Sequence, residues 1–232
     1  MKNKKYIFVI VIFLLISFFV LSIINKISNQ TYQTTYINNH ELDGPIAQIV
    51  DDYQNDDIIG TLEIPNTGYK TVVVQGKDNK YYLRRDVNKK YARGGTPFLD
   101  YRVNLDSKKL LIYGHNSKYV DMPFKILENY YNKSYYDKHK YLNLKTKDGT
   151  IKYEIFSVYV EPQNWSYLKV DFKNDNEYEK HLKMLKNNSM YDTGVEVSKD
   201  DQILLLQTCS TKKEYELYKK KFLLVIARKV SE

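Results

Sequence analysis

The chain has 232 residues, enough for one domain and a short additional segment. Hydrophobic residues make up 43% of it, and the formal charge of +8 suits a protein that works beside an anionic membrane, cell-wall polymer or nucleic acid. Nucleic acid is the least favoured of these three, because the lysines are scattered and the sequence has no nucleic-acid-binding motif. The single cysteine excludes an internal disulfide, so an exported protein must either bury this thiol or use it.

An apolar stretch near the N-terminus predicts a transmembrane helix. It runs from Tyr6 to Ile24, and its 19 residues are long enough for a helix to cross the hydrocarbon core. Lysines before it predict a cytoplasmic N-terminus, with the rest of the chain outside the cell. A cleaved signal peptide is the alternative, but no small-residue cleavage site follows. We therefore expect residues 1–26 to be an uncleaved anchor of a single-pass membrane protein.

Residues 27–42 are polar and lack periodicity, which predicts a linker between this anchor and a folded domain over 43–232. Asp43-Gly44-Pro45 then indicates the start of a helix, with proline in its first turn. Apolar residues follow at helical spacing, so one face of this helix is expected to dock on the domain: Ile46, Ile49, Val50 and Tyr53.

From residue 58 the pattern is typical of strands. Asp148-Gly149 separates two clearly alternating segments and indicates a hairpin. The segments near 110 and 204 are apolar on both faces, as central strands of a closed sheet are. We expect eight strands, at about 58–64, 70–75, 96–101, 109–114, 140–146, 150–160, 202–208 and 222–230.

Two helices interrupt these strands, one beginning near Asp121 and one over about 176–188. Eight strands with few helices predict a mainly β fold in the form of a small barrel.

Two of the apolar strands end on residues with catalytic potential. Cys209 lies in 203–210 (ILLLQTCS), and His115 lies in 110–116 (LLIYGHN). A lone cysteine beside a leucine run is usually a small buried hydrophobe, and a histidine at a loop edge is often satisfied by hydrogen bonds. Together, however, they can form a thiol nucleophile and its acid–base partner. The other histidines are expected to be solvated: His40, His139 and His181.

Seven motifs follow one another along the chain: Ile58-Ile59-Gly60-Thr61-Leu62-Glu63-Ile64-Pro65, Val73-Val74-Gln75-Gly76, Asp78-Asn79, Tyr82-Leu83, Gly95-Thr96-Pro97-Phe98-Leu99-Asp100-Tyr101, Tyr113-Gly114-His115-Asn116 and Thr208-Cys209. In this order they resemble the motifs of sortases, and the match covers about 43–230. The helices before the first strand and over 176–188 resemble those of class B members.

The resemblance implies an eight-stranded sortase barrel and a cysteine transpeptidase. Such an enzyme cuts a C-terminal sorting signal of the Pro-x-Thr-(Gly/Asn) type after Thr and holds the acyl group as a thioester. It then transfers that group to an amine of a peptidoglycan precursor. The implied partners are the sorting-signal peptide, this amine and, through the N-terminal helix, the membrane; no cofactor, metal or nucleic acid is implied.

The resemblance makes Cys209 the nucleophile and His115 the acid–base group. Sortases also use an arginine at the start of the strand after the cysteine. Here that position falls near Lys221, whereas the only later arginine, Arg228, lies near the end of the last strand. The resemblance places substrate binding at Asn79, Leu83, Tyr113, Tyr167, Gln207 and Thr208.

Two alternatives stay open. One is a thiol hydrolase of another kind; a papain-like protease, however, has its cysteine first, whereas here His115 precedes Cys209 by 94 positions. The other is a non-catalytic wall-binding barrel.

Overall fold

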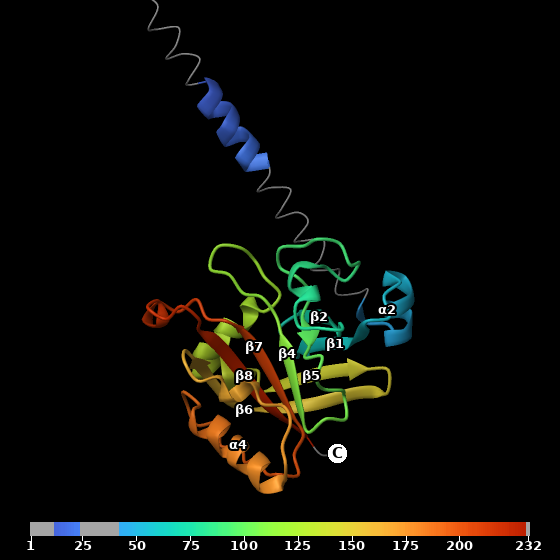
Figure 1. Cartoon of the computed structure of the whole chain (residues 1–232), viewed down its shortest axis with the longest axis vertical. Helices are drawn as coiled ribbons and strands as arrows, with labels where there is room; N and C mark the ends of the chain where they lie inside the picture. The colour runs from blue at the N-terminus through green and yellow to red at the C-terminus, as the bar shows by residue number, and fades with distance from the viewer. Residues whose placement is uncertain (1–11, 24–41, 231–232) are drawn as a thin grey trace, which may run out of the picture.

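Eight strands close into one barrel within the part of the chain that the structure, a computed structural model, describes: residues 12–23 and 42–230. The order around the barrel is β1-β2-β3-β4-β7-β8-β6-β5 (Figure 1). The eight-stranded barrel predicted from the sequence is thus confirmed. The strands are β1 Ile58–Ile64, β2 Tyr69–Val74, β3 Phe98–Leu99, β4 Lys109–Tyr113, β5 Tyr141–Thr146, β6 Gly149–Glu161, β7 Ile203–Cys209 and β8 Phe222–Lys229.

Short helices connect and cover these strands. The helix expected near residue 121 begins four residues later, because the backbone N–H of Phe124 is still bonded to the carbonyl of His115 (3.0 Å). The helices are α2 Ile46–Tyr53, η2 Tyr81–Arg84, η3 Lys125–Tyr131, α3 Lys133–Lys138, η4 Trp165–Leu168, α4 Asp175–Asn187 and η5 Lys213–Tyr215.

The two faces of β7 are buried against different parts of the molecule. Leu204 and Leu206 pack inside the barrel, whereas Ile203 and Leu205 pack in a second cluster on its outer face. Helix α4, which lies against the outside of the barrel in Figure 1, contributes Leu182 to that outer cluster. Because both faces are covered, residues 203–206 of this strand are all apolar, as the sequence predicted.

Helix α2 covers a different part of the barrel. Its Ile46 and Ile49 are buried against Val72 and Val74 of β2. The predicted docking face of this helix is therefore correct, and it closes the side of the barrel formed by the first two strands.

The N-terminal segment differs from the prediction. Residues 12–23 are helical. The rest of the predicted span, and the predicted linker apart from Leu42, lie outside the described residues. No helix in the described ranges is long and apolar enough to cross a membrane. The predicted single-pass membrane location and membrane partner are therefore corrected.

Replacing Leu205 by alanine should lower the free energy of unfolding by about 2–5 kcal/mol, because it leaves a cavity between β7 and α4. Denaturant unfolding followed by circular dichroism measures this change. Leu217, which is 98% exposed, is the matched control, and its alanine variant should change stability by less than about 0.5 kcal/mol. Equal effects of the two substitutions would contradict this account of the core.

Candidate active site

The pairing of β4 with β7 brings His115 and Cys209 to the same edge of the barrel. The two strands are parallel, and Tyr113 pairs with Gln207, so His115 and Cys209 each follow a matched pair by two residues. Both side chains therefore leave the sheet on the same face. Figure 1 shows β4 and β7 side by side.

Hydrogen bonds continue this pairing beyond the regular ladder. The backbone N–H of Gly114 donates to the carbonyl of Gln207 (3.0 Å), and the Thr208 hydroxyl donates to the carbonyl of Gly114 (2.8 Å). The Asn116 amide donates to the carbonyl of Cys209 (2.9 Å). These three bonds fix the backbone on either side of the histidine and the cysteine. The buried Thr208, predicted to bind substrate, uses its hydroxyl within the protein.

Gly114 is required by the close approach of Phe124. A Cβ atom at this position would lie 2.5 Å from the Phe124 ring, closer than side chains pack. Any other residue would push apart β4 and the following segment. The glycine before His115 thus lets a buried aromatic ring support the backbone that presents the imidazole.

Cys209 is exposed at the end of β7, so a ligand can reach its sulfur. The surrounding protein atoms nevertheless desolvate the thiol, and this burial raises its pKa. At neutral pH the sulfur is therefore mostly protonated. A nucleophile in this state needs a neighbouring base to remove its proton.

The pKa of His115 is shifted in the opposite direction, downward. Burial lowers its pKa; a hydrogen bond to the carbonyl of Leu83 opposes this change, and the charge of Arg84 adds to it. Because a carbonyl only accepts, the 2.9 Å contact from Nε2 to Leu83 means that Nε2 carries the proton. Nδ1 is then the nitrogen free to accept another. The resting pair is thus a neutral thiol beside a neutral imidazole.

A buried carboxylate joins two of the predicted substrate-binding residues. Asp100, which is 0% exposed, accepts from the Tyr113 hydroxyl (2.7 Å) and the Asn79 amide (3.0 Å). Burial acts to raise the pKa of Asp100, but hydrogen bonds from Arg102 and Tyr113 lower it by more. The net shift of this pKa is therefore downward. Asp100 and Arg102 were not singled out in the sequence, although Asp100 lies in one of the motifs.

The other predicted binding residues lie around the cysteine. The Tyr167 hydroxyl donates to the side-chain oxygen of Gln207 (3.0 Å), two residues before Cys209. Leu83 contacts the site through its carbonyl, which binds His115. We refer to Tyr167 with Gln207 as one side of the candidate site, and to Tyr113 with Asn79 as the other.

The register of β8 separates Lys221 from the cysteine. Cys209 is opposite Phe222, whereas the N–H of Ser210 donates to the carbonyl of Lys221 (3.0 Å). Ser210 turns inward to Tyr131 (2.7 Å), and residues directly opposite share a face. The side chain of Lys221 is therefore on the face away from Cys209. The next residue back, Lys220, has its side chain on the opposite face from Lys221. Its ammonium lies 5.2 Å from the centre of the Trp165 ring.

Arg228 is remote from the thiol. It pairs with Ile203 at the start of β7, six residues before Cys209, or about 20 Å along the strand. Its guanidinium forms ion pairs with Glu154 (2.9 Å) and Asp201 (3.7 Å). This arginine therefore binds neighbouring strands and loops rather than the site.

The prediction that His181 is solvated is wrong. Its side chain is 7% exposed, and its Nε2 lies 3.0 Å from the ammonium of the buried Lys109. His181 lies on the buried face of α4, together with Tyr178, Leu182 and Leu185. His139 is half-buried, and His40 lies outside the described residues.

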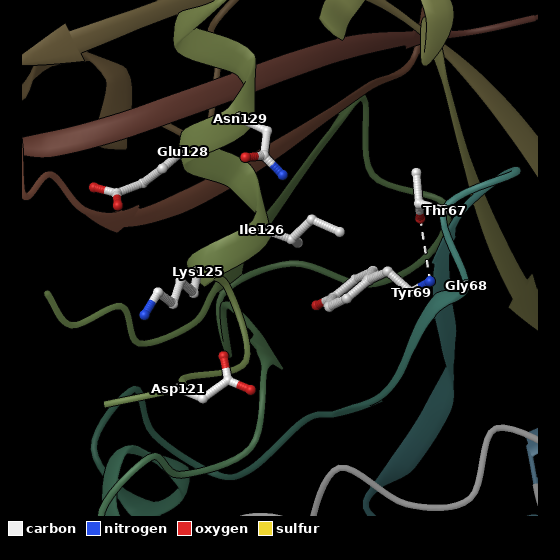
Figure 2. Close-up of a pocket in the computed structure, with 8 residues that line it drawn as sticks. All are labelled: Thr67, Gly68, Tyr69, Asp121, Lys125, Ile126, Glu128 and Asn129. Carbon is white, nitrogen blue, oxygen red and sulfur yellow. Dashed lines mark hydrogen bonds between the residues drawn. The ribbon is translucent and has the colours of Figure 1, made fainter. Parts of the chain in front are cut away.

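A cavity of about 470 Å³ lies apart from the cysteine and histidine, between the β1–β2 turn and η3. In Figure 2, Ile126 and Tyr69 extend toward one another across it. Its link to the site is Glu128, which accepts from the N–H (2.9 Å) and hydroxyl (2.5 Å) of Thr211. Among the residues that the structure describes, no group of acidic, histidine and cysteine side chains could hold a metal ion.

The raised pKa of Cys209 predicts slow alkylation at neutral pH. Only the thiolate reacts, so the rate with iodoacetamide should rise with pH through a midpoint above the ordinary thiol value of about 8.5. Mass spectrometry follows the reaction at this single cysteine. The same chain in urea is the control and should have the ordinary midpoint. A folded midpoint below that of the control would indicate a thiolate–imidazolium pair instead.

Residues 62–230 match the family model described as the Sortase domain. Two curated relatives are similar over most of this region. Sortase B of Staphylococcus aureus (strain NCTC 8325 / PS 47) is 34% identical over 67% of this chain and 64% of its own length. Sortase B of Listeria monocytogenes (serovar 1/2a, strain EGD-e) is 35% identical over 70% and 66%. The chain thus spans just under two thirds of the length of these relatives.

Solved structures are similar over a larger part of their chains. Sortase B of Clostridium perfringens has a TM-score of 0.72 and 30% identity, covering 80% of this chain and 100% of the other. A Staphylococcus aureus sortase B–substrate complex has a TM-score of 0.72 and 27% identity, covering 89% and 96%. A sortase B complexed with triglycine has a TM-score of 0.72 and 28% identity, covering 89% and 97%.

Proposed function

Because the chain belongs to class B of the sortase family, whose members are cysteine transpeptidases, we propose that it joins sorting-signal proteins to the cell wall through a thioester on Cys209. The observation that carries this proposal is the parallel register of β4 and β7, with His115 and Cys209 at adjoining strand ends. A protein that only bound a wall polymer would have no use for an exposed thiol beside a neutral imidazole.

The first step is attack of the Cys209 sulfur on the carbonyl carbon of the threonine in the sorting signal. As the sulfur–carbon bond forms, the thiol proton passes to the free ring nitrogen of His115. The carbon–nitrogen bond then breaks, and the same proton goes to the departing amine. The product is a thioester on the enzyme and a released C-terminal peptide.

The second step reverses the proton movement. An incoming amine attacks the thioester, and His115 removes a proton from its nitrogen. The carbon–sulfur bond breaks, and the sulfur recovers a proton. Transfer is favoured over hydrolysis only if the amine reaches the thioester before water does, which makes the binding of the second substrate decisive.

The proposed substrate is a signal of the Pro-x-Thr-(Gly/Asn) type, lying between the Tyr113–Asn79 side and the Tyr167–Gln207 side. The similar structures of sortase B with a substrate and with triglycine support a peptide and an amine as the two partners. The proposed acceptor is an amine of a peptidoglycan precursor.

The donor that stabilises the oxyanion is a separate question. The sequence predicts Lys221, but strand parity turns its side chain away from Cys209. We therefore propose that a backbone N–H near the strand ends, rather than Lys221, supplies this hydrogen bond.

Cys209→Ala should abolish product formation, and His115→Ala should lower it severely, because the leaving amine loses its proton donor. The assay incubates residues 42–232 with a Pro-x-Thr-Gly peptide and triglycine, and mass spectrometry identifies the product. A peptide joined to triglycine indicates transfer, whereas a free acid indicates a thiol hydrolase. Thermal unfolding of both variants is the control for folding. Wild-type turnover by the alanine variant of Cys209 would refute the thioester.

Lys221→Ala should lower turnover less than about tenfold, because its ammonium does not face the thiol. Loss of a true oxyanion donor costs about 10²–10³ in kcat. Lys213→Ala is the matched control, since this lysine is exposed in the same connection. A loss of about 10² or more for Lys221 alone would mean that this lysine does supply the oxyanion contact.

A further inference from the structure

Lys109, the first residue of β4, is buried without a carboxylate partner. Its ammonium donates to the carbonyls of Tyr167 and Lys169 (2.9 Å to the latter) and lies 3.0 Å from Nε2 of His181. An ammonium has three N–H donors, so each one has an acceptor. All three acceptors belong to the connection between β6 and β7, which includes η4 and α4.

This arrangement is costly for folding. Burial, followed by the nearby charge of Arg102, lowers the pKa of Lys109 to about 7, although Asp100 acts in the opposite direction. Burial, followed by the charges of Lys109 and Lys169, lowers the pKa of His181 to about 3, so this ring is a neutral acceptor. An apolar side chain would fill the same space without desolvating a charge. Core packing alone therefore gives no reason for a lysine here.

Arg102 binds the carbonyl of Leu168, which lies between the two carbonyls that Lys109 binds. Its Nη2 donates to the carbonyl of Leu168 (3.1 Å), while Nε and Nη2 hold both oxygens of the buried Asp100. The three consecutive carbonyls of residues 167–169 are thus bound by two cations of the barrel. A short 3-10 turn cannot satisfy these carbonyls itself, so the cations define where this segment lies.

The segment held in this way forms one side of the candidate active site. Tyr167 is buried, and its hydroxyl reaches Gln207, two residues before Cys209. Trp165 contacts Phe222, the residue opposite Cys209, at a ring separation of 5.4 Å. The other side is connected to Arg102, because the Asp100 that binds Arg102 also binds Tyr113 and Asn79.

We propose that Lys109 and Arg102 are positioning residues that hold residues 165–169 against the barrel and so determine how tightly the sorting-signal peptide is bound. Neither touches the reacting atoms; they act through Tyr167 and the backbone that presents it. The effect on peptide binding rests on the proposed function, whereas the holding of the segment does not.

The test compares Lys109→Met with Lys108→Met. Methionine keeps an unbranched side chain, one atom shorter than that of lysine, but leaves the three acceptors without donors. Lys108 is its exposed neighbour, and its ammonium binds Asp175 (2.7 Å) and the carbonyl of Lys199 (3.3 Å). Hydrogen exchange of residues 165–169 measures the holding of the segment, and peptide kinetics measure the consequence.

For Lys109→Met we expect amide exchange in residues 165–169 to accelerate about tenfold or more, and KM for the peptide to rise by a similar factor. The alkylation midpoint of Cys209 should be unchanged, because the β4–β7 pairing is intact. Lys108→Met should match wild type in all three measurements. Wild-type exchange and wild-type KM in Lys109→Met would overturn the proposal.

A second variant covers the case in which Lys109→Met does not fold. Arg102→Lys keeps a cation beside Asp100 but loses the fork that reaches Leu168 at the same time. Faster exchange in residues 165–169 is again expected, with a higher KM. Unchanged exchange would refute the holding role even in a preparation without transpeptidase activity, whereas faster exchange with unchanged KM would refute the effect on binding.

Discussion

The parallel pairing of β4 with β7 is the constraint on which the rest of the structure depends. Parallel strands cannot be joined by a tight turn, so the chain between them must cross over, and here it contributes two more strands and α4. In return, the carboxyl ends of both strands lie at one edge of the barrel. A histidine and a cysteine that are 94 positions apart in the sequence become neighbours without any other device. Because α4 covers the outer face of β7, that edge is held on a strand buried on both sides.

Desolvation at this edge has opposite effects on the two candidate catalytic groups. It raises the pKa of the Cys209 thiol and lowers that of the His115 imidazole, so each shift favours the uncharged form. In the proposed reaction the proton therefore starts on the sulfur of Cys209 and moves to the imidazole as the bond to substrate forms. An exposed thiol in this state is less open to oxidation or alkylation than a thiolate would be. The neutral pair also leaves less charge to desolvate when a peptide covers the site.

The charged groups near the site are instead those of the network formed by Asp100, Arg102 and Lys109. Asp100 remains ionised because Arg102 and Tyr113 bind it, and Lys109 is buried among backbone carbonyls and His181. Buried charges stabilise a protein poorly, but they bind particular oxygens at particular distances. The network thus fixes the position of residues 165–169, which have little regular backbone hydrogen bonding of their own. Arg102 connects the Tyr167 side of the site, through the carbonyl of Leu168, with the Tyr113 side, through Asp100.

Local patterns in the sequence were enough to predict the strands. The ends of two of these strands then identified His115 and Cys209 as candidate catalytic residues. The apolar runs before His115 and Cys209 and the Asp148-Gly149 turn were sufficient for a barrel, because periodicity and turn chemistry act over a few residues. The apolar run at residues 6–24 predicted a membrane span, and no helix among the described residues is long and apolar enough to be one. Only the tertiary structure decided the burial of Lys109 and His181, the pairing of Asp100 with Arg102 and the face on which Lys221 lies. These features depend on register and on contacts between distant segments, and a shift of one residue in a strand reverses the face of every side chain, which no local pattern reports.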